Sequence, residues 1–100
     1  MKTIFLSGRL TSDPTVTEAG EKNTKLAKFT LANNDAGKDS PAEYFDVHCW
    51  DSLAELTENN LKKGNKIIVQ GSFSNAPYTD KEGAKKTHFE ITAKKIEFAD

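Results

Sequence analysis

The alternation of side chains between Glu43 and Trp50 is the sequence feature that most constrains the fold of this chain. One of its two alternating sets is entirely apolar and consists of Phe45, Val47 and Cys49. The other set is mixed and consists of Tyr44, Asp46, His48 and Trp50. Because successive side chains of a strand point to opposite sides, the pattern predicts a strand with an apolar core face. Its second face is polar and carries an aromatic ring at each end.

The two rings of this strand, Tyr44 and Trp50, stand six positions apart on the same face. Rings on an otherwise polar sheet face favour a stacking platform, and nucleobases are the commonest flat partners of such a platform. Rings in this position can equally cover a neighbouring hairpin or a subunit interface. The strand by itself leaves both interpretations open.

Four further segments show the apolar alternation of strands, namely residues 3–10, 25–33, 65–74 and 85–98. Residues 15–17 are expected to form a short continuation of the first strand. Gly8, inside that first strand, predicts a bulge or a sharp bend, and a second bulge is expected near Lys94 and Lys95.

Directly after the strand that ends at Trp50, the apolar period changes from that of a strand to that of a helix. The residues that recur at helical spacing are Leu53, Ala54, Leu56 and Leu61. Asp51 or Ser52 is in position to cap the start of this helix, because short polar side chains accept bonds from its first N–H groups. Two lysines followed by a glycine, residues 62–64, are typical of a helix end.

The predicted order is therefore three strands, one helix and two strands. This is the layout of a mostly β, five-stranded Greek-key barrel of the oligonucleotide-binding (OB) type, with one helix between strands 3 and 4. A half-open antiparallel sandwich is the competing architecture. A chain of 100 residues has room for one core, so we expect a single OB-fold domain over residues 1–100.

The net charge of −1 argues against a protein that binds polyanions by charge alone. The charges are unevenly spread: residues 11–60 hold four lysines and ten acidic residues, whereas residues 61–100 hold eight lysines and five acidic residues. The C-terminal part can thus form a local basic patch, although an ordinary solvated surface has the same composition.

The sequence gives no sign of membrane insertion or of export. Apolar runs are far shorter than a membrane span, and the apolar N-terminal segment is too short for a signal peptide. A single cysteine, Cys49, excludes an intramolecular disulfide and indicates a reducing compartment. We therefore expect a cytoplasmic protein with no membrane association.

Reactive side chains do not form a catalytic pattern. His48 and Cys49 are neighbours, but they point to opposite faces of one strand and so cannot act as a base and a nucleophile together. The sequence has no metal-ligand spacing, phosphate-binding loop or paired-carboxylate signature. We expect a protein that is not an enzyme and that uses no cofactor and no metal.

Short motifs along the chain resemble those of the bacterial single-stranded DNA-binding (SSB) protein family, in family order. They are GRLTSDP (8–14), AKFTLA (27–32), EYFDVHCW (43–50), LAE (53–55), LKKG (61–64), VQG (69–71), YTDKEG (78–83) and EI (90–91). Each motif is weak alone, and their common order over nearly the whole chain makes the set specific.

The resemblance implies an OB-fold barrel that binds single-stranded DNA without sequence preference and protects it in replication, recombination or repair. By position in the motifs, the stacking rings would be Tyr44, Trp50 and Tyr78. The cations expected to contact phosphates are Lys28, Lys62, Lys63 and Arg9. Such a protein would be associated with the nucleoid.

The chain also departs from the family pattern. Asp46 lies between the rings where members commonly have a basic or neutral residue, residues 74–77 replace an often arginine-rich stretch, and the loop 34–42 carries no ring. The chain stops at Asp100 without an acidic tail, so recruitment of partner enzymes through such a tail is not expected. The alternative function is an OB-fold accessory module, primosome-like, with weak or lost DNA binding, that acts through protein–protein contacts.

The resemblance further implies a homodimer or homotetramer. Ile4, Phe5 and Leu6 lie on an N-terminal strand whose apolar edge can pair with a second copy, and Phe45 sits where family members tune the subunit contact. The other interpretation is that these four residues pack inside one barrel.

Overall fold

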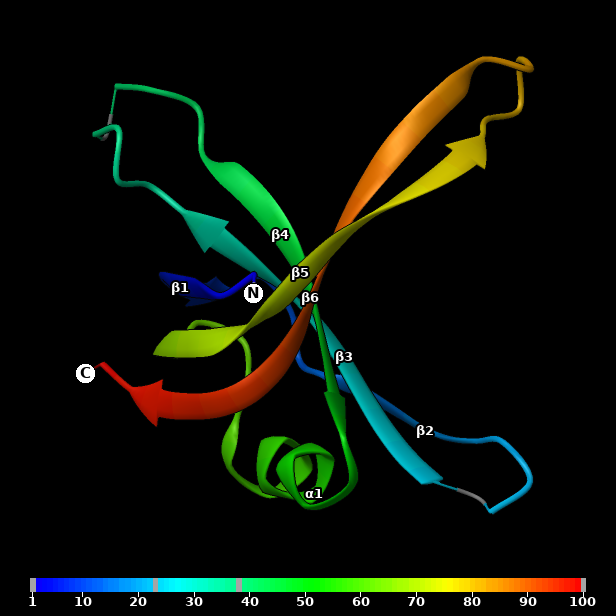
Figure 1. The fold of residues 1–100 in the computed structure, drawn as a ribbon. Helices are drawn as coiled ribbons and strands as arrows, with labels where there is room; N and C mark the ends of the chain where they lie inside the picture. The colour runs from blue at the N-terminus through cyan, green and yellow to red at the C-terminus, as the bar shows by residue number, and fades with distance from the viewer. Residues whose placement is uncertain (1, 23, 38, 100) are drawn as a thin grey trace.

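The structure, a computed structural model, describes residues 2–22, 24–37 and 39–99. Its elements in chain order are β1 (Ile4–Leu10), β2 (Thr15–Ala19), β3 (Thr24–Asn33), β4 (Glu43–Trp50), α1 (Asp51–Asn60), β5 (Lys66–Thr79) and β6 (Lys85–Phe98). Figure 1 shows strongly twisted strands that cross at the centre of the molecule, with two loop regions projecting beyond it at the top.

Five of the strands close into a barrel. The sheet order is β1-β5-β6-β4-β3-β2, and an additional pairing of β1 with β3 joins the two sides. Neighbouring strands are antiparallel except β4 and β6, which are parallel. The mostly β OB-type barrel is thus confirmed, and it is closed rather than half open.

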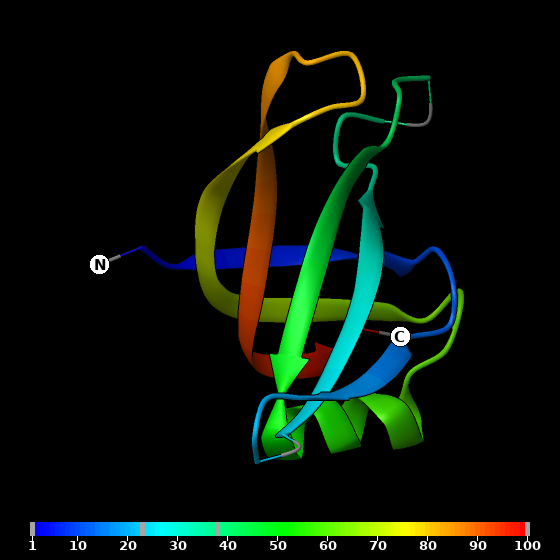
Figure 2. The same ribbon diagram turned by 90° about the vertical axis from the view of Figure 1, so that its right-hand side faces the viewer.

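The strand β2 stands outside the closed barrel, and among the described residues it pairs with β3 alone, from Thr15 opposite Lys28 to Ala19 opposite Thr24. It is therefore a separate strand, and residues 15–17 do not continue β1 as expected. With β2 set aside, α1 lies between the third and fourth barrel strands, as predicted. Figure 2 shows α1 at the end of the barrel opposite the two projecting loop regions.

Two glycines allow the strands to approach closely enough for closure. A Cβ on Gly8 would lie 2.7 Å from the carbonyl oxygen of Ala32, and one on Gly71 would meet the carbonyl oxygen of Thr92. The pairing of β1 with β5 continues without a shift through Gly8, so the bulge expected there is wrong, and the glycine instead allows the close approach of β1 to β3.

The bulge expected near Lys94 and Lys95 is confirmed. Gln70 pairs with Lys95, whereas the next residue, Gly71, pairs with Ala93, so Lys94 is the additional residue. A bulge of this kind increases the local twist. Beyond it the β5–β6 hairpin leaves the barrel as a long projection, here named the β5–β6 arm (residues 75–89; Figures 1 and 2).

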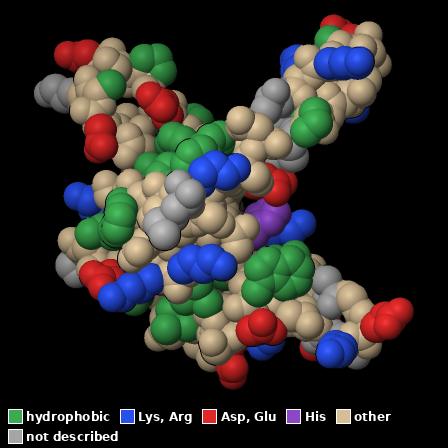
Figure 3. All heavy atoms as spheres, in the orientation of Figure 1, with side chains coloured by type: hydrophobic (Ala, Val, Ile, Leu, Met, Phe, Trp, Pro, Cys, Tyr) green, Lys and Arg blue, Asp and Glu red, His purple; other side chains and the backbone are tan. Residues whose placement is uncertain are grey.

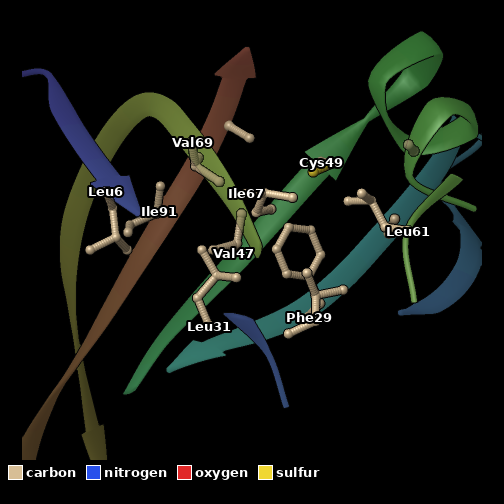
Figure 4. Packing of buried hydrophobic residues seen from close by; sticks show 13 residues of the cluster. Leu6, Phe29, Leu31, Val47, Cys49, Leu61, Ile67, Val69 and Ile91 are labelled. Carbon is tan, nitrogen blue, oxygen red and sulfur yellow. The ribbon is translucent and has the colours of Figure 1, made fainter. Parts of the chain in front are cut away.

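The inner faces of the strands form one hydrophobic core (Figure 4). Its fully buried strand residues include Leu31, Val47, Cys49, Ile67, Val69 and Ile91. The apolar face predicted for β4 is confirmed, with Phe45 partly buried at its outer end. There the ring of Phe89 lies 6.1 Å from that of Phe45 and 5.1 Å from that of Phe73, so an aromatic group covers the core at the base of the arm.

The helix α1 differs from the expectation at both ends. Trp50 is its N-cap residue and makes no side-chain capping bond, so neither Asp51 nor Ser52 provides the predicted cap. Asp51 instead has a φ of +56°, a left-handed conformation that aspartate tolerates better than most residues. The helix ends at Asn60, so Lys62 and Lys63 lie beyond it.

The buried face of α1 also differs in one residue. Ala54 and Thr57 are fully buried and Leu61 is buried just after the helix, whereas Leu56 is 40% exposed. With only ten residues, α1 is short, and no helix in the described part of the chain has the length and apolar character of a membrane span.

Candidate nucleic-acid interface

The outward side chains of β3, β4 and β6 form one continuous surface, here named the platform face. Its members are Lys28, Thr30, Tyr44, Asp46, His48, Trp50, Glu90 and Thr92. The registers place Thr30, Asp46 and Glu90 side by side across the three strands, and Lys28, His48 and Thr92 in the next row. The predicted outward face of β4 therefore lies at the centre of a three-stranded surface.

The rings of Tyr44 and Trp50 stand at the two ends of this surface. Tyr44 is 66% exposed and is open to another molecule, whereas Trp50 is 40% exposed and lies opposite the buried Leu26, so only part of its ring is open. Six residues of strand separate them by roughly 20 Å at about 3.3 Å per residue. Each ring can therefore stack on a different flat partner, with the polar centre of the platform face between them.

The third predicted ring, Tyr78, lies on the β5–β6 arm opposite Lys86 and is 46% exposed. Tyr78 lies four positions after Ser74 on β5 and therefore points to the same side of the sheet. Ser74 pairs with Glu90 of the platform face. The arm thus continues the sheet beyond the barrel and carries Tyr78 with it (Figure 2). The three rings are distributed over the platform face and the arm rather than gathered at one point.

Between the two rings of β4 the platform face is hollowed by a pocket of about 360 Å³, here named the platform pocket. Its lining residues are Ser12, Thr15, Lys28, Phe29, Thr30, Asp46, His48 and Glu90. In Figure 3 acidic, basic and histidine side chains meet in the recess beneath the arm. Ser12 of the loop before β2 and Thr15 at the start of β2 form one wall of the pocket.

The acidic side chains of this pocket have a defined arrangement. Asp46 pairs in register with Glu90 on the parallel neighbour β6, and Thr30 on the other neighbour donates its hydroxyl to Asp46 Oδ1 at 2.9 Å. Two carboxylates lie side by side at the centre of the platform face, and Lys28 lies in the next row.

Two of the predicted cations follow the helix in a turn that packs on the end of β1. The N–H of Lys63 donates to Asp13 Oδ1 at 2.8 Å, and the N–H of Gly64 donates to the carbonyl of Leu10 at 2.9 Å. Asp13 is the neighbour of Ser12, which lines the platform pocket. The structure therefore brings the exposed Lys62 and Lys63 to the strand end that borders the platform face.

The predicted cation Arg9 lies on the outside of β1, where its Nη1 donates to the carbonyl of Gly64 at 2.9 Å. The registers place Lys66, Arg9, Ala32 and Tyr44 in one row across β5, β1, β3 and β4. Arg9 and Tyr44 are thus separated only by the small side chain of Ala32.

Lys66, Glu90 and Thr30 are further residues of the candidate interface that the sequence did not identify as candidates. Glu90 lies between the apolar Phe89 and Ile91 of a predicted strand, so it was recognisable as an outward residue. The neighbourhood of Lys66 and Arg9 was not recognisable, because it depends on how β5 pairs with β1.

The four residues predicted for a subunit interface are placed very differently. Leu6 is buried in the core, and Ile4 and Phe45 are partly buried against it. Phe5 is 69% exposed and borders a hollow of about 110 Å³ together with Ile68. Of these four residues, Phe5 therefore presents the most exposed side chain to another molecule.

Cys49 is fully buried, and its burial raises the pKa of the thiol to about 11. The thiol thus stays protonated near neutral pH and is not a nucleophile. Within the ranges that the structure describes, no group of three or more histidine, cysteine or acidic side chains could hold a metal ion.

Comparison with known proteins identifies one family. Residues 1–99 match the single-strand binding protein family. Single-stranded DNA-binding protein 2 of Chlorobaculum tepidum is 28% identical over 104 residues, which cover 98% of this chain and 70% of that protein. The single-stranded DNA-binding protein of Caldanaerobacter subterraneus is 31% identical, over 95% of this chain and 65% of its own. Single-stranded DNA-binding protein 3 of Clostridium acetobutylicum is 32% identical over 101 residues, covering 98% of this chain and 70% of that protein.

Proposed function

The chain belongs to the single-strand binding protein family, and on that premise we propose that it binds single-stranded DNA on the platform face and the β5–β6 arm. Bases stack on Tyr44, Trp50 and Tyr78, and nearby cations contact the phosphates. The observation that carries the proposal is the pair of exposed rings at the two ends of the hollowed face of β4. The protein does no chemistry on the strand. It holds and covers it during replication, recombination or repair, in the cytoplasm at the nucleoid.

Stacking supplies most of the affinity in this proposal. A base stacked on an aromatic ring contributes roughly 1–3 kcal/mol, so three rings contribute roughly 3–9 kcal/mol before the cost of ordering the strand. Stacking needs a flat partner and not a particular base, so the rings bind many sequences.

The phosphate contacts are few. Lys28 lies on the platform face, Lys62 and Lys63 lie in the turn that borders it, and Arg9 lies one small residue away from Tyr44. The carboxylate of Asp46 opposes them at the centre. A single copy of the chain is therefore a weak binder, and a second linked copy would raise the affinity through the higher local concentration of sites.

We place the contact between copies at the exposed Phe5 and Ile68 on the outer face of β1 and β5. Ile4, Leu6 and Phe45 act on that contact only from inside, by holding β1 and β4 against the core. Residues 4–8 of β1 pair with β5, and the described part of the chain pairs β3 with β1 only at Arg9 and Leu10. The first half of β1 thus has an edge at which a homodimer or homotetramer can form.

A second candidate function is an accessory module that uses protein contacts and has little DNA affinity. The adjacent carboxylates of Asp46 and Glu90 on the platform face favour it, since they repel phosphates. A mobility-shift titration with oligo-dT at low and at moderate salt separates the two candidates. A shifted complex at micromolar protein supports DNA binding, and no complex at either salt supports the accessory module.

A further inference from the structure

We propose that a second pocket, at the bulge of β5 and β6, holds a phosphate group of the bound strand. This inference rests on the proposed function and adds a phosphate site to it. The pocket, here named the bulge pocket, has a volume of about 200 Å³. Its lining residues are Lys2, Thr3, Gln70, Gly71, Ser72 and Lys94.

The chemistry of this lining fits a phosphate group. It combines two lysines with two hydroxyls and one side-chain amide, and these are the side-chain groups that contact phosphate and sugar oxygens in protein–DNA complexes. None of the described residues that line the bulge pocket is acidic. Two cations beside one small pocket attract an anion, and the neutral donors around them can share its oxygens.

The bulge brings the first of the two cations to the pocket. Gln70 pairs with Lys95, and the next residue of β5, Gly71, pairs with Ala93, so Lys94 is the additional residue between them. Bulges interrupt the regular alternation of a strand and give a side chain a new direction. The feature that twists the β5–β6 arm away from the barrel therefore also places a lysine at the bulge pocket.

The second cation, Lys2, comes from the segment before β1. Its Nζ lies 5.8 Å from the centre of the Phe73 ring, and this cation–π contact holds the side chain over β5. A lysine ammonium has three N–H donors, so the contact with the ring leaves donors for phosphate oxygens. Within the described part of the chain, neither Lys2 nor Lys94 is paired with a carboxylate.

The bulge pocket lies next to the platform face. The registers place His48, Thr92 and Ser72 in one row across β4, β6 and β5. His48 lines the platform pocket and Ser72 lines the bulge pocket, so two strand spacings, roughly 10 Å in all, separate the two positions. Ser72 also lies six positions before Tyr78 on β5, and both therefore point to the same side of the sheet. A strand bound on the platform face and the arm can thus place a phosphate in the bulge pocket.

The test is fluorescence anisotropy with labelled oligo-dT at a series of salt concentrations. Lys94→Gln and Lys2→Gln should each weaken binding roughly twofold to fivefold, the range for one exposed charge pair. For the double variant, a tenfold rise in salt should lower the logarithm of the binding constant by about 0.7 less than for the unmodified protein, the amount for one neutralised phosphate. Glutamine retains a hydrogen-bond donor, so the comparison reports mainly on the charge.

Lys22→Gln, in the exposed turn between β2 and β3, makes the same change of net charge outside the bulge pocket and is the matched control. It should keep the affinity and the salt dependence of the unmodified protein. Undiminished affinity in the double variant, or an equal loss in the control, would overturn the inference while leaving DNA binding intact. Failure of the unmodified protein to bind oligo-dT at low salt would instead overturn the proposed function, and this inference with it.

Discussion

Thr30 donates its hydroxyl to Asp46 Oδ1 at 2.9 Å across the β3–β4 pair, on the stretch of β4 between the rings of Tyr44 and Trp50. An acidic group is thereby held in place where a strand stacked on both rings would pass. A carboxylate in this position opposes the phosphates of such a strand.

Asp46→Arg should raise the affinity for oligo-dT several-fold, because it replaces a carboxylate that repels phosphates by a guanidinium that can contact one. For single strands, a tenfold rise in salt concentration lowers the logarithm of the binding constant by about 0.7 for each phosphate that the protein neutralises. The few cations of the unmodified protein predict a weak dependence of the affinity on salt. In the variant this dependence should increase by the amount expected for about one additional phosphate contact. Titrations at a series of salt concentrations measure both quantities. Glu55→Arg makes the same charge change on α1, and an equal gain there would show that net charge alone is responsible.

Tyr44→Ala should weaken binding of oligo-dT by about 1–3 kcal/mol, since it removes one stacking surface. The ring is 66% exposed, so the free energy of unfolding should change little. Tyr44→Phe keeps the ring and should bind nearly as tightly as the unmodified protein. Anisotropy titration and chemical denaturation report on the two effects separately. Undiminished affinity in Tyr44→Ala would remove this ring from the site.

Gly71→Ala should destabilise the fold by about 1–3 kcal/mol, because the added Cβ meets the backbone of Thr92 and Ala93 at the β5–β6 bulge. Neither partner is the end of a flexible side chain, so strands must shift. Urea denaturation of the variant measures the loss. Ser72→Ala, at the next position, should cost much less, and a similar loss in both would show that the close crossing is not the cause.

The stability of the fold should fall as the pH rises above about 9. Burial raises the pKa of Cys49 to about 11, whereas an exposed thiol in the unfolded chain has its pKa near 8.5. Between these two pKa values the unfolded state loses a proton that the folded state retains, so unfolding becomes more favourable by up to about 1.4 kcal/mol per pH unit. Below about pH 8.5 both states are protonated and this contribution is constant.

Denaturation curves at several alkaline pH values, compared between the unmodified protein and Cys49→Ala, isolate this effect from that of lysines and tyrosines. The difference between the two proteins should shrink with rising pH. A difference that stays constant from neutral pH to about pH 10 would contradict the raised pKa of the buried thiol.

Side-chain alternation was sufficient to predict which faces of the strands are buried. Phe45, Val47 and Cys49 lie inward as expected, and the bulge at Lys94 was recognisable from two consecutive lysines that interrupt the alternation. These features are local, since each depends only on the two-residue period of a strand. The closure of the barrel followed from the order of elements and not from any single residue.

Features that depend on pairing between distant strands could not be predicted. The place of Glu90 beside Asp46 requires the parallel register of β6 with β4, and the neighbourhood of Arg9 and Tyr44 requires the closing pair of β1 and β3. The start of α1 was also missed, because Asp51 adopts a left-handed conformation instead of capping the helix. The interface expected at Leu6 was a different kind of error, because alternation in β1 already turns Phe5 outward and Leu6 into the core.

Trp50 is the only tryptophan of the chain, so its emission reports on the platform face alone. The most direct test of the account is a titration of this emission with oligo-dT at low salt. The account predicts saturable quenching as bases stack on the ring, with the midpoint shifted to higher oligo-dT concentration by Tyr44→Ala. An emission that stays unchanged while a mobility shift shows the DNA bound would contradict it, because the strand would then lie on another face.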